Sequence, residues 1–260
     1  MKKNIILGLA IVGSLLVAPF SRAKEKEVVV VTAGDVHPFS FEKKGQLTGY
    51  DIEVLKAAEE LMDDYRFSFK KTSWESIFVG LDSGHYQVGA NNLSFTKERA
   101  DKHLYSEPIA TNPLVLISLK NAKVKHLKNF GGLTTQDDTG TSTAKLVTDW
   151  NKTHKDNPST IDYSGEDVSK RLLDLDNGEF DYLISDKISV KTIIKQKDLD
   201  LYVTSIKSQD NPNNYIIFSD EQKDLQKSFN KALEKLQKSG KLEKISRTYL
   251  GGNYLTSSNS

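Results

Sequence analysis

The stretch VVVVTAGDVHPFSFEKKGQLTGYDIEVLKAAEELM, residues 28–62, decides the fold class of this 260-residue chain. Its first part, 28–33, is a continuous β-branched run, which is typical of a strand buried on both faces. Its last part, 49–62, has helical spacing, and the apolar face holds Ile52, Leu55, Ala58, Leu61 and Met62. A buried strand followed by an amphipathic helix indicates an α/β protein.

The same alternation continues toward the C-terminus. Strands are expected at 65–72, 87–94, 113–119, 132–140, 180–186, 201–206 and 214–220, and helices at 74–86, 141–154, 166–178, 187–197, 220–240 and 241–252. Strands joined by crossover helices imply parallel pairing. The elements form two α/β series without a Gly-Pro linker between them, which indicates two lobes that lie close together.

Residues 1–23 have the order of a secretory signal peptide. Lys2 and Lys3 precede the apolar run 5–17, and cleavage is expected after Ala23. The run has 13 residues, whereas a membrane anchor needs roughly 20. A lipoprotein would carry a cysteine at the cleavage site, and this sequence has none. We therefore expect an exported, extracytoplasmic protein.

Composition excludes several classes of function. The net charge is +1, from 36 basic and 35 acidic side chains, which argues against nucleic acid or an anionic membrane as the main partner. The absence of cysteine excludes disulfides, thiolate zinc sites and thiol catalysis. The five histidines are scattered without metal-ligand spacing. We expect no metal ion and no cofactor.

NNLSFTKERADKHLYSEPI, residues 91–109, places Arg99 five residues after Ser94, where a predicted strand becomes a helix. Ligands of open α/β sheets bind at the carboxyl ends of the strands, so Arg99 is expected at the edge of a cleft. A guanidinium can meet a carboxylate with two parallel hydrogen bonds. The alternative is an ordinary surface ion pair with Glu98 or Asp101.

Two further motifs offer groups for a charged ligand. In DTGTS, residues 138–142, Gly140 allows close approach of the backbone, and Thr141 and Ser142 add hydroxyls at a helix N-terminus, which attracts anions. Asp186 ends a predicted strand and can accept an ammonium group. For both motifs the alternative is a helix cap that needs no ligand.

Six segments, in this order, resemble the bacterial amino-acid-binding proteins of ABC importers: TAGDVHPFSFEKKGQLTGYDIEVLKAAEEL, WESIFVGLDSG, SFTKERADKHLYSEPI, DTGTS, FDYLISD and LEKLQKSGKLEKISRTYLG. Within this family the chain looks most like the cystine-binding members and is near their glutathione-binding relatives. The resemblance implies a two-lobed periplasmic-binding-protein fold of type II. Each lobe is then a mainly parallel sheet flanked by helices, and two crossover strands join the lobes.

The resemblance also implies the lobe boundaries and the ligand contacts. Lobe one is expected to hold 24–112 and 213–260, and lobe two 113–212. By analogy with the family, Arg99 binds the ligand carboxylate and Asp186 its α-amino group. The residues expected to contact ligand are Phe39, Trp74, Asn92, Leu93, Ser94, Arg99, Gly140, Thr141, Ser142 and Asp186. For the two aromatic residues in this set, core packing is the alternative.

The function implied by the resemblance is solute capture, by hinge closure of a monomer, for the permease and ATPase subunits of an ABC importer. L-Cystine is the expected ligand, and glutathione or another polar amino acid is the alternative. A periplasmic dehydratase on the same fold is the alternative class. Such an enzyme needs a further acid or base in the cleft, and the sequence predicts none beside Arg99 and Asp186. We therefore expect no enzymatic activity.

Overall fold

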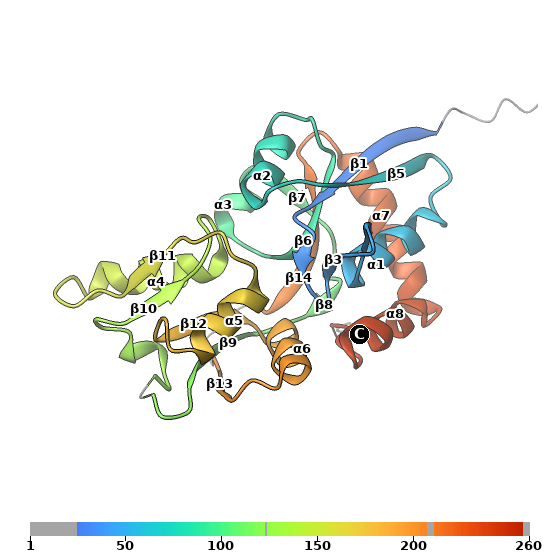
Figure 1. Ribbon diagram of the computed structural model, residues 1–260. Helices are drawn as coiled ribbons and strands as arrows, with labels where there is room; N and C mark the ends of the chain where they lie inside the picture. The colour runs from blue at the N-terminus through green and yellow to red at the C-terminus, as the bar shows by residue number, and fades with distance from the viewer. Residues whose placement is uncertain (1–24, 123, 207–210, 257–260) are drawn as a thin grey trace, which may run out of the picture.

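A computed structural model of the protein describes residues 25–122, 124–206 and 211–256. The predicted signal peptide, residues 1–23, lies outside the described residues. The chain forms two α/β lobes, as predicted. Figure 1 shows the two ends of the described chain, blue to cyan and orange to red, in one lobe, and its middle part, green to orange, in the other.

The first lobe contains a six-stranded sheet with the spatial order β5-β1-β6-β14-β7, and β8 also pairs with β14. Its strands are β1 (Lys26–Thr32), β5 (Tyr65–Lys71), β6 (Val88–Ser94), β7 (His103–Tyr105), β8 (Ala110–Thr111) and β14 (Asn213–Ser219). β1 is parallel to both β5 and β6, as expected. β14 is antiparallel to each of its three neighbours.

The β-branched run of β1 supplies apolar side chains to both faces of this sheet. Val30 packs in the cluster that contains α1 (Tyr50–Glu59), α7 (Lys223–Lys238) and α8 (Lys241–Leu250). Val31 packs in a separate cluster with α2 (Trp74–Asp82). Because neighbouring residues of a strand point to opposite faces, an unbroken apolar run fits a strand that is covered on both sides.

A small antiparallel sheet, which we did not predict, follows β1 and precedes α1 along the chain. It consists of β2 (Asp35–Val36), β3 (Ser40–Lys43) and β4 (Gln46–Thr48). Lys44 and Gly45 join β3 to β4 with φ values of 54° and 76°. Two successive residues with positive φ are typical of a tight hairpin turn.

The second lobe has β9 (Leu114–Leu119) between β12 (Tyr182–Asp186) and β13 (Leu201–Ser205). β9 is antiparallel to both neighbours, which differs from the expected mainly parallel sheet. β12 and β13, which are joined by α6 (Lys187–Lys197), run in the same direction, and β9 lies between them in the opposite direction, with Leu114 paired to Asp186. The remaining elements are β10 (Thr134–Gln136), β11 (Thr160–Asp162), η1 (Leu127–Asn129), α4 (Ser142–Thr153) and α5 (Val168–Asp176).

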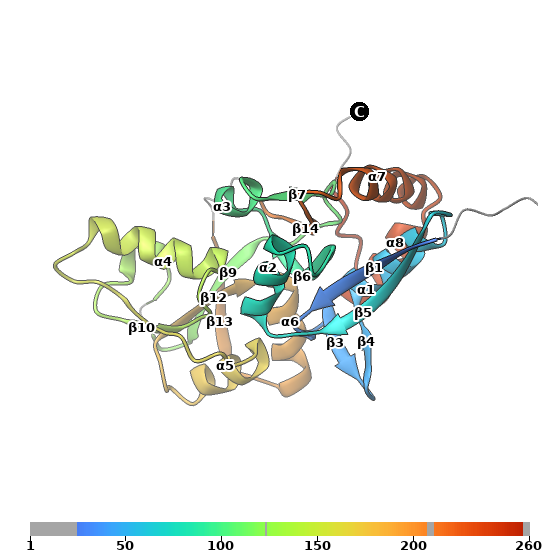
Figure 2. The same ribbon diagram turned by 90° about the horizontal axis from the view of Figure 1, so that it is seen from above.

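The chain passes twice between the lobes, and the two passages lie side by side. The Asn112 amide donates to the Pro212 carbonyl at 2.7 Å. After the second passage, β14 joins the sheet of the first lobe and α7 and α8 pack beside α1, as Figure 2 shows from above. The exact boundaries, 112/113 and 212/213, remain a prediction.

The helix predicted at 220–240 is α7, and it buries an apolar stripe. Leu225, Phe229, Leu233 and Leu236 are each at most 3% exposed and belong to the main cluster of the first lobe. A fully buried side chain of this size contributes roughly 1.5–3 kcal/mol through the hydrophobic effect. The last part of the chain is therefore integral to the first lobe.

Phe229→Ala should lower the free energy of unfolding by about 3–5 kcal/mol, because it removes a fully buried aromatic ring and leaves a cavity. Urea denaturation followed by circular dichroism measures this loss. Lys231→Ala, at an exposed position of the same helix, is the matched control and should stay within about 0.5 kcal/mol of wild type. Equal stability of the two variants would contradict the packing of α7.

Candidate functional site

A cavity of about 960 Å³, measured out to its open mouth, lies between the two lobes. The first lobe contributes residues of β2, β6, α2 and α3 (Lys97–Ala100). The second lobe contributes the loop between β10 and α4, the start of α5 and the end of β12. The cavity therefore lies at the carboxyl ends of β6 and β12, where ligands of α/β sheets bind.

Arg99 lies in the wall of this cavity and is 8% exposed. It belongs to the single turn of α3, which the Thr96 side chain caps by accepting from the Arg99 amide at 3.2 Å. Its Nη1 donates to the Ser94 carbonyl at 3.2 Å, and its Nη2 donates to the Gly140 carbonyl of the other lobe at 3.0 Å. Burial lowers the pKa of the guanidinium.

Two aromatic rings lie against Arg99. The guanidinium carbon is 4.6 Å from the ring centroid of Phe78 and 5.3 Å from that of Trp74, within the range of cation–π attraction. Asp101 pairs with Lys97, and Glu98 pairs with Lys145 of the second lobe. Among the described residues Arg99 has no ion pair, so the surface-pair alternative does not occur in this structure.

Asp186 lies in the opposite wall and is also 8% exposed. Its Oδ1 accepts from the Ser189 amide at 2.8 Å, which caps α6, and from the Asn112 side chain at 2.7 Å. Burial raises the pKa of this carboxyl. No ion pair of Asp186 exists within the described ranges. The cap that the sequence offered as an alternative is thus present, and the carboxyl group also lines the cavity.

Asn92 connects the two walls. It has a φ of 52° within β6, where the pairing with β14 shifts register. Asparagine tolerates this left-handed conformation better than most residues other than glycine. Its backbone N–H donates to Asp51 Oδ2 at 2.7 Å, and its side-chain Oδ1 accepts from the side chains of Asn112 and Asn214. The asparagines that flank both interlobe passages therefore hydrogen-bond a residue of the cavity.

Asp51 does not line the cavity but holds the backbone N–H of Asn92 in place. The side chain is fully buried at the start of α1, and its Oδ1 has no hydrogen-bond partner. Burial raises its pKa to about 7, against an ordinary value of 3.8, and the charge of Asp186 acts in the same direction. The hydrogen bond from the Asn92 amide opposes the shift.

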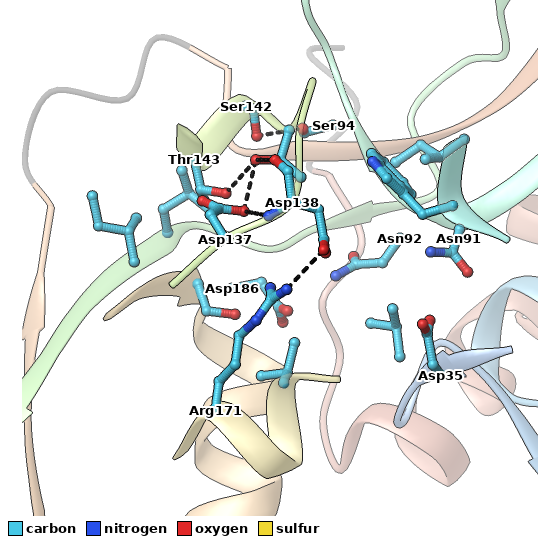
Figure 3. Close-up of a pocket in the computed structure, with 18 of the residues that line it drawn as sticks. Asp35, Asn91, Asn92, Ser94, Asp137, Asp138, Ser142, Thr143, Arg171 and Asp186 are labelled. Atoms are coloured by element: carbon cyan, nitrogen blue, oxygen red, sulfur yellow. Dashed lines mark hydrogen bonds and ion pairs between the residues drawn. The ribbon is translucent and has the colours of Figure 1, made fainter. Parts of the chain in front are cut away.

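Direct contacts also join the lobes beside Arg99. The Ser94 hydroxyl donates to the Ser142 hydroxyl at 2.9 Å, and the Trp74 indole donates to the Thr139 carbonyl at 3.0 Å. Thr141 caps α4 by accepting from the Ala144 amide at 2.9 Å. Figure 3 shows Ser94 and Ser142 facing each other at one end of the cavity.

The structure brings most of the predicted ligand residues together. Those that line the cavity are Trp74, Asn92, Leu93, Ser94, Arg99, Thr141, Ser142 and Asp186. Gly140 does not line the cavity, but its carbonyl accepts a hydrogen bond from Arg99. Phe39 is fully buried and packs edge-on against Tyr50 in the core of the first lobe. It therefore belongs to that core and not to the cavity wall that the sequence predicted.

Several lining residues were missed by the sequence analysis. Asp35, Asp138 and Glu166 bring further carboxylates to the cavity, which corrects the expectation that Arg99 and Asp186 are its only charged groups. Arg171 adds a second arginine from the first turn of α5. A turn residue or a residue of an amphipathic helix gives no signal in the sequence that it faces a cleft. Within the described chain no cluster of His, Asp or Glu is arranged to hold a metal ion.

The chain matches the model of one protein family, the bacterial extracellular solute-binding proteins, family 3, over residues 28–252. This match covers most of the chain, so the protein belongs to that family, as the resemblance indicated. The described part of the chain has no helix of the length and hydrophobicity that a bilayer-crossing segment needs. The family acts outside the cytoplasm, which confirms the predicted location.

Individual relatives are similar over nearly the whole chain. The L-cystine-binding protein TcyJ of Bacillus subtilis is 31% identical over 89% of this chain and 86% of its own. A solved structure described with glutathione import via GshT and the cystine ABC importer TcyBC of Streptococcus mutans is 46% identical, with a TM-score of 0.87 over 89% of this chain and 98% of its own. A putative L-cystine ABC transporter structure from Listeria monocytogenes is 25% identical, with a TM-score of 0.79 over 89% of this chain and 98% of its own.

Asp51 should make stability depend on pH. Its pKa is about 7 in the folded protein against an ordinary 3.8, so the folded state binds the proton more tightly than the unfolded chain. The stabilising contribution is complete below pH 4 and is lost as the pH rises to 7. The free energy of unfolding of wild type, relative to Asp51→Asn, should therefore fall across this window in urea denaturation.

The exposed Asp63 supplies the control for this measurement. Asp63→Asn should follow wild type at each pH. If the curves of wild type and Asp51→Asn were parallel between pH 4 and pH 7, the raised pKa of Asp51 would be refuted.

Proposed function

We propose that this protein captures an α-amino-acid head group between its lobes and delivers the ligand to the membrane subunits of an ABC importer. The supporting observation is the pair Arg99 and Asp186. These opposite charges come from the two lobes, line one cavity and are nine-tenths buried, and neither has an ion-pair partner among the described residues. A zwitterion between them supplies the missing partner of each.

The geometry supports the proposed contacts. Arg99 uses Nη1 and Nη2 each once, toward backbone carbonyls, and a guanidinium has five N–H donors. A ligand carboxylate can take donors that remain, together with the hydroxyls of Ser94 and Ser142. The ligand ammonium then lies against Asp186 and the backbone of Asn92, and Trp74 contacts the ligand side chain.

For the ligand we propose L-cystine, with glutathione as the alternative. L-Cystine is supported by the names of the relatives in Bacillus subtilis and Listeria monocytogenes. Glutathione is supported by the 46%-identical structure from Streptococcus mutans, whose description names glutathione import. Both compounds carry the head group that the two charges can hold.

The proposed mechanism is hinge closure of two lobes, 24–112 plus 213–260 and 113–212, in a monomer. The direct contacts from Ser94 to Ser142 and from Trp74 to Thr139 support closure, because they form only when the lobes meet. A clamp of this kind encloses the ligand and presents one joint surface to the importer.

We further propose that the ligand leaves chemically unchanged. Two carboxylates of the cavity have partners within the fold, since Asp138 pairs with Arg171 at 2.8 Å and Asp167 caps α5. The relatives are solute-binding proteins, which supports the same conclusion. Mass spectrometry of released ligand after incubation tests it, and a changed mass would favour the enzyme alternative.

Arg99→Ala should abolish calorimetric binding of L-cystine or glutathione, whichever wild type binds. Removal of one partner of a desolvated charge pair costs roughly 2–5 kcal/mol or more. Arg99→Lys should also bind poorly, because an ammonium cannot reproduce the guanidinium fork. Lys97→Ala, on the exposed side of the same turn, is the control and should bind like wild type. Wild-type affinity of Arg99→Ala would refute the proposed carboxylate site.

Asp186→Asn should weaken the same ligand by roughly 2–5 kcal/mol, because the buried ammonium loses its counter-ion. The amide oxygen can still cap α6, so thermal stability should change by about 1 kcal/mol or less. The matched probe is a ligand analogue without the α-amino group, for which the variant should lose little further affinity. A variant that melts early and binds normally would reduce Asp186 to a helix cap.

A further inference from the structure

Arg171 is a second buried arginine in the cavity wall, apart from the Arg99–Asp186 pair. It lies in the first turn of α5, in the second lobe, and is 5% exposed. Its Nη2 donates to Asp138 Oδ1 at 2.8 Å, which is the only hydrogen bond of its side chain among the described residues. Figure 3 shows Arg171 reaching Asp138 from the side of the cavity opposite Ser94 and Ser142.

The protein leaves this guanidinium incompletely satisfied. Its Nε is buried without a hydrogen-bond partner. Buried polar groups in folded proteins are nearly always hydrogen-bonded, and each exception needs an explanation. A single carboxylate partner uses one of the five N–H groups of a fork that can serve two carboxylates. The remaining donors fit a second anionic group.

The cavity that Arg171 lines holds further carboxylates from both lobes. Asp35 of the first lobe and Asp167 of the second lobe also line the cavity. Desolvation raises the pKa of Asp35, and the charges of Asp138 and Asp167 raise it further. An additional anion in this region is therefore repelled unless it lies directly against Arg171.

We propose that Arg171 holds a second carboxylate of the ligand, distant from the α-amino-acid head group that Arg99 and Asp186 bind. This inference rests on the proposed function and narrows it to ligands that carry two carboxylates. L-Cystine and glutathione share that chemistry. In L-cystine the second carboxylate has an ammonium on the same carbon, and the carboxylates of the cavity can accept that ammonium. The glycine carboxylate of glutathione has no ammonium beside it.

The test compares ligands that differ only at the far end. One pair is L-cystine and the mixed disulfide of cysteine with cysteamine, which lacks the second carboxylate. The other pair is glutathione and its ethyl ester at the glycine carboxylate. Calorimetry on wild type, Arg171→Gln and Arg171→Lys gives the dissociation constants. Lys170→Gln, at the neighbouring exposed position, is the matched control, and melting temperatures without ligand verify the fold.

Wild type should bind the dicarboxylate member of one pair at least about tenfold more tightly than its partner. Arg171→Gln should lose about tenfold or more for that member and little for the partner, and Arg171→Lys should recover part of the loss. The pair that shows this pattern identifies the ligand. Lys170→Gln should retain the wild-type discrimination.

Two results would overturn the inference alone. The first is an equal loss by Arg171→Gln for both members of a pair, which indicates a structural role for the arginine. The second is binding by wild type without discrimination within either pair. No binding of any of the four compounds to folded wild type would overturn the proposed ligand class as well as this second carboxylate site.

Discussion

The structure depends on the burial of two opposite charges that do not touch each other. Arg99 and Asp186 are withdrawn from water on opposite walls of one cavity. A charge buried without a partner is costly, and the protein reduces that cost with backbone carbonyls at Arg99 and with amide and asparagine donors at Asp186. The remaining imbalance supports the proposal that the site takes a zwitterion, since no neutral group can satisfy both ends.

The same polar network ties the cavity to the connections between the lobes. Asn112 and Asn214 flank the two passages of the chain, and both donate to Asn92. Asp51 accepts a hydrogen bond from the backbone N–H of Asn92. The side chain of Asn112 also donates to Asp186. A residue expected to contact the ligand therefore shares its hydrogen bonds with the two segments that connect the lobes. The orientation of the lobes and the shape of the site are not independent.

Much of this organisation is readable from the sequence because it rests on local patterns. The run 28–33, the stripe of α7 and the cap at Asp186 each follow from residue periodicity or a helix-start signal. The return of α7 and α8 to the first lobe and the antiparallel direction of β9 could not be derived, because they are set by contacts between distant segments. Phe39, expected at the cavity, lies in the core of the first lobe, and Arg171, for which the sequence made no prediction, lines the cavity. Whether a side chain faces the core or a cleft depends on tertiary packing, which the local sequence does not describe.

The position of Trp74 gives the protein a built-in optical reporter. The chain has two tryptophans. Trp150 stacks on His154 at 3.9 Å within the second lobe, so its surroundings are the same whichever way the lobes turn. Trp74 donates its indole N–H to Thr139 across the lobe boundary. Separation of the lobes would transfer that N–H from a carbonyl to water, so the emission of this one indole should distinguish lobes in contact from lobes apart.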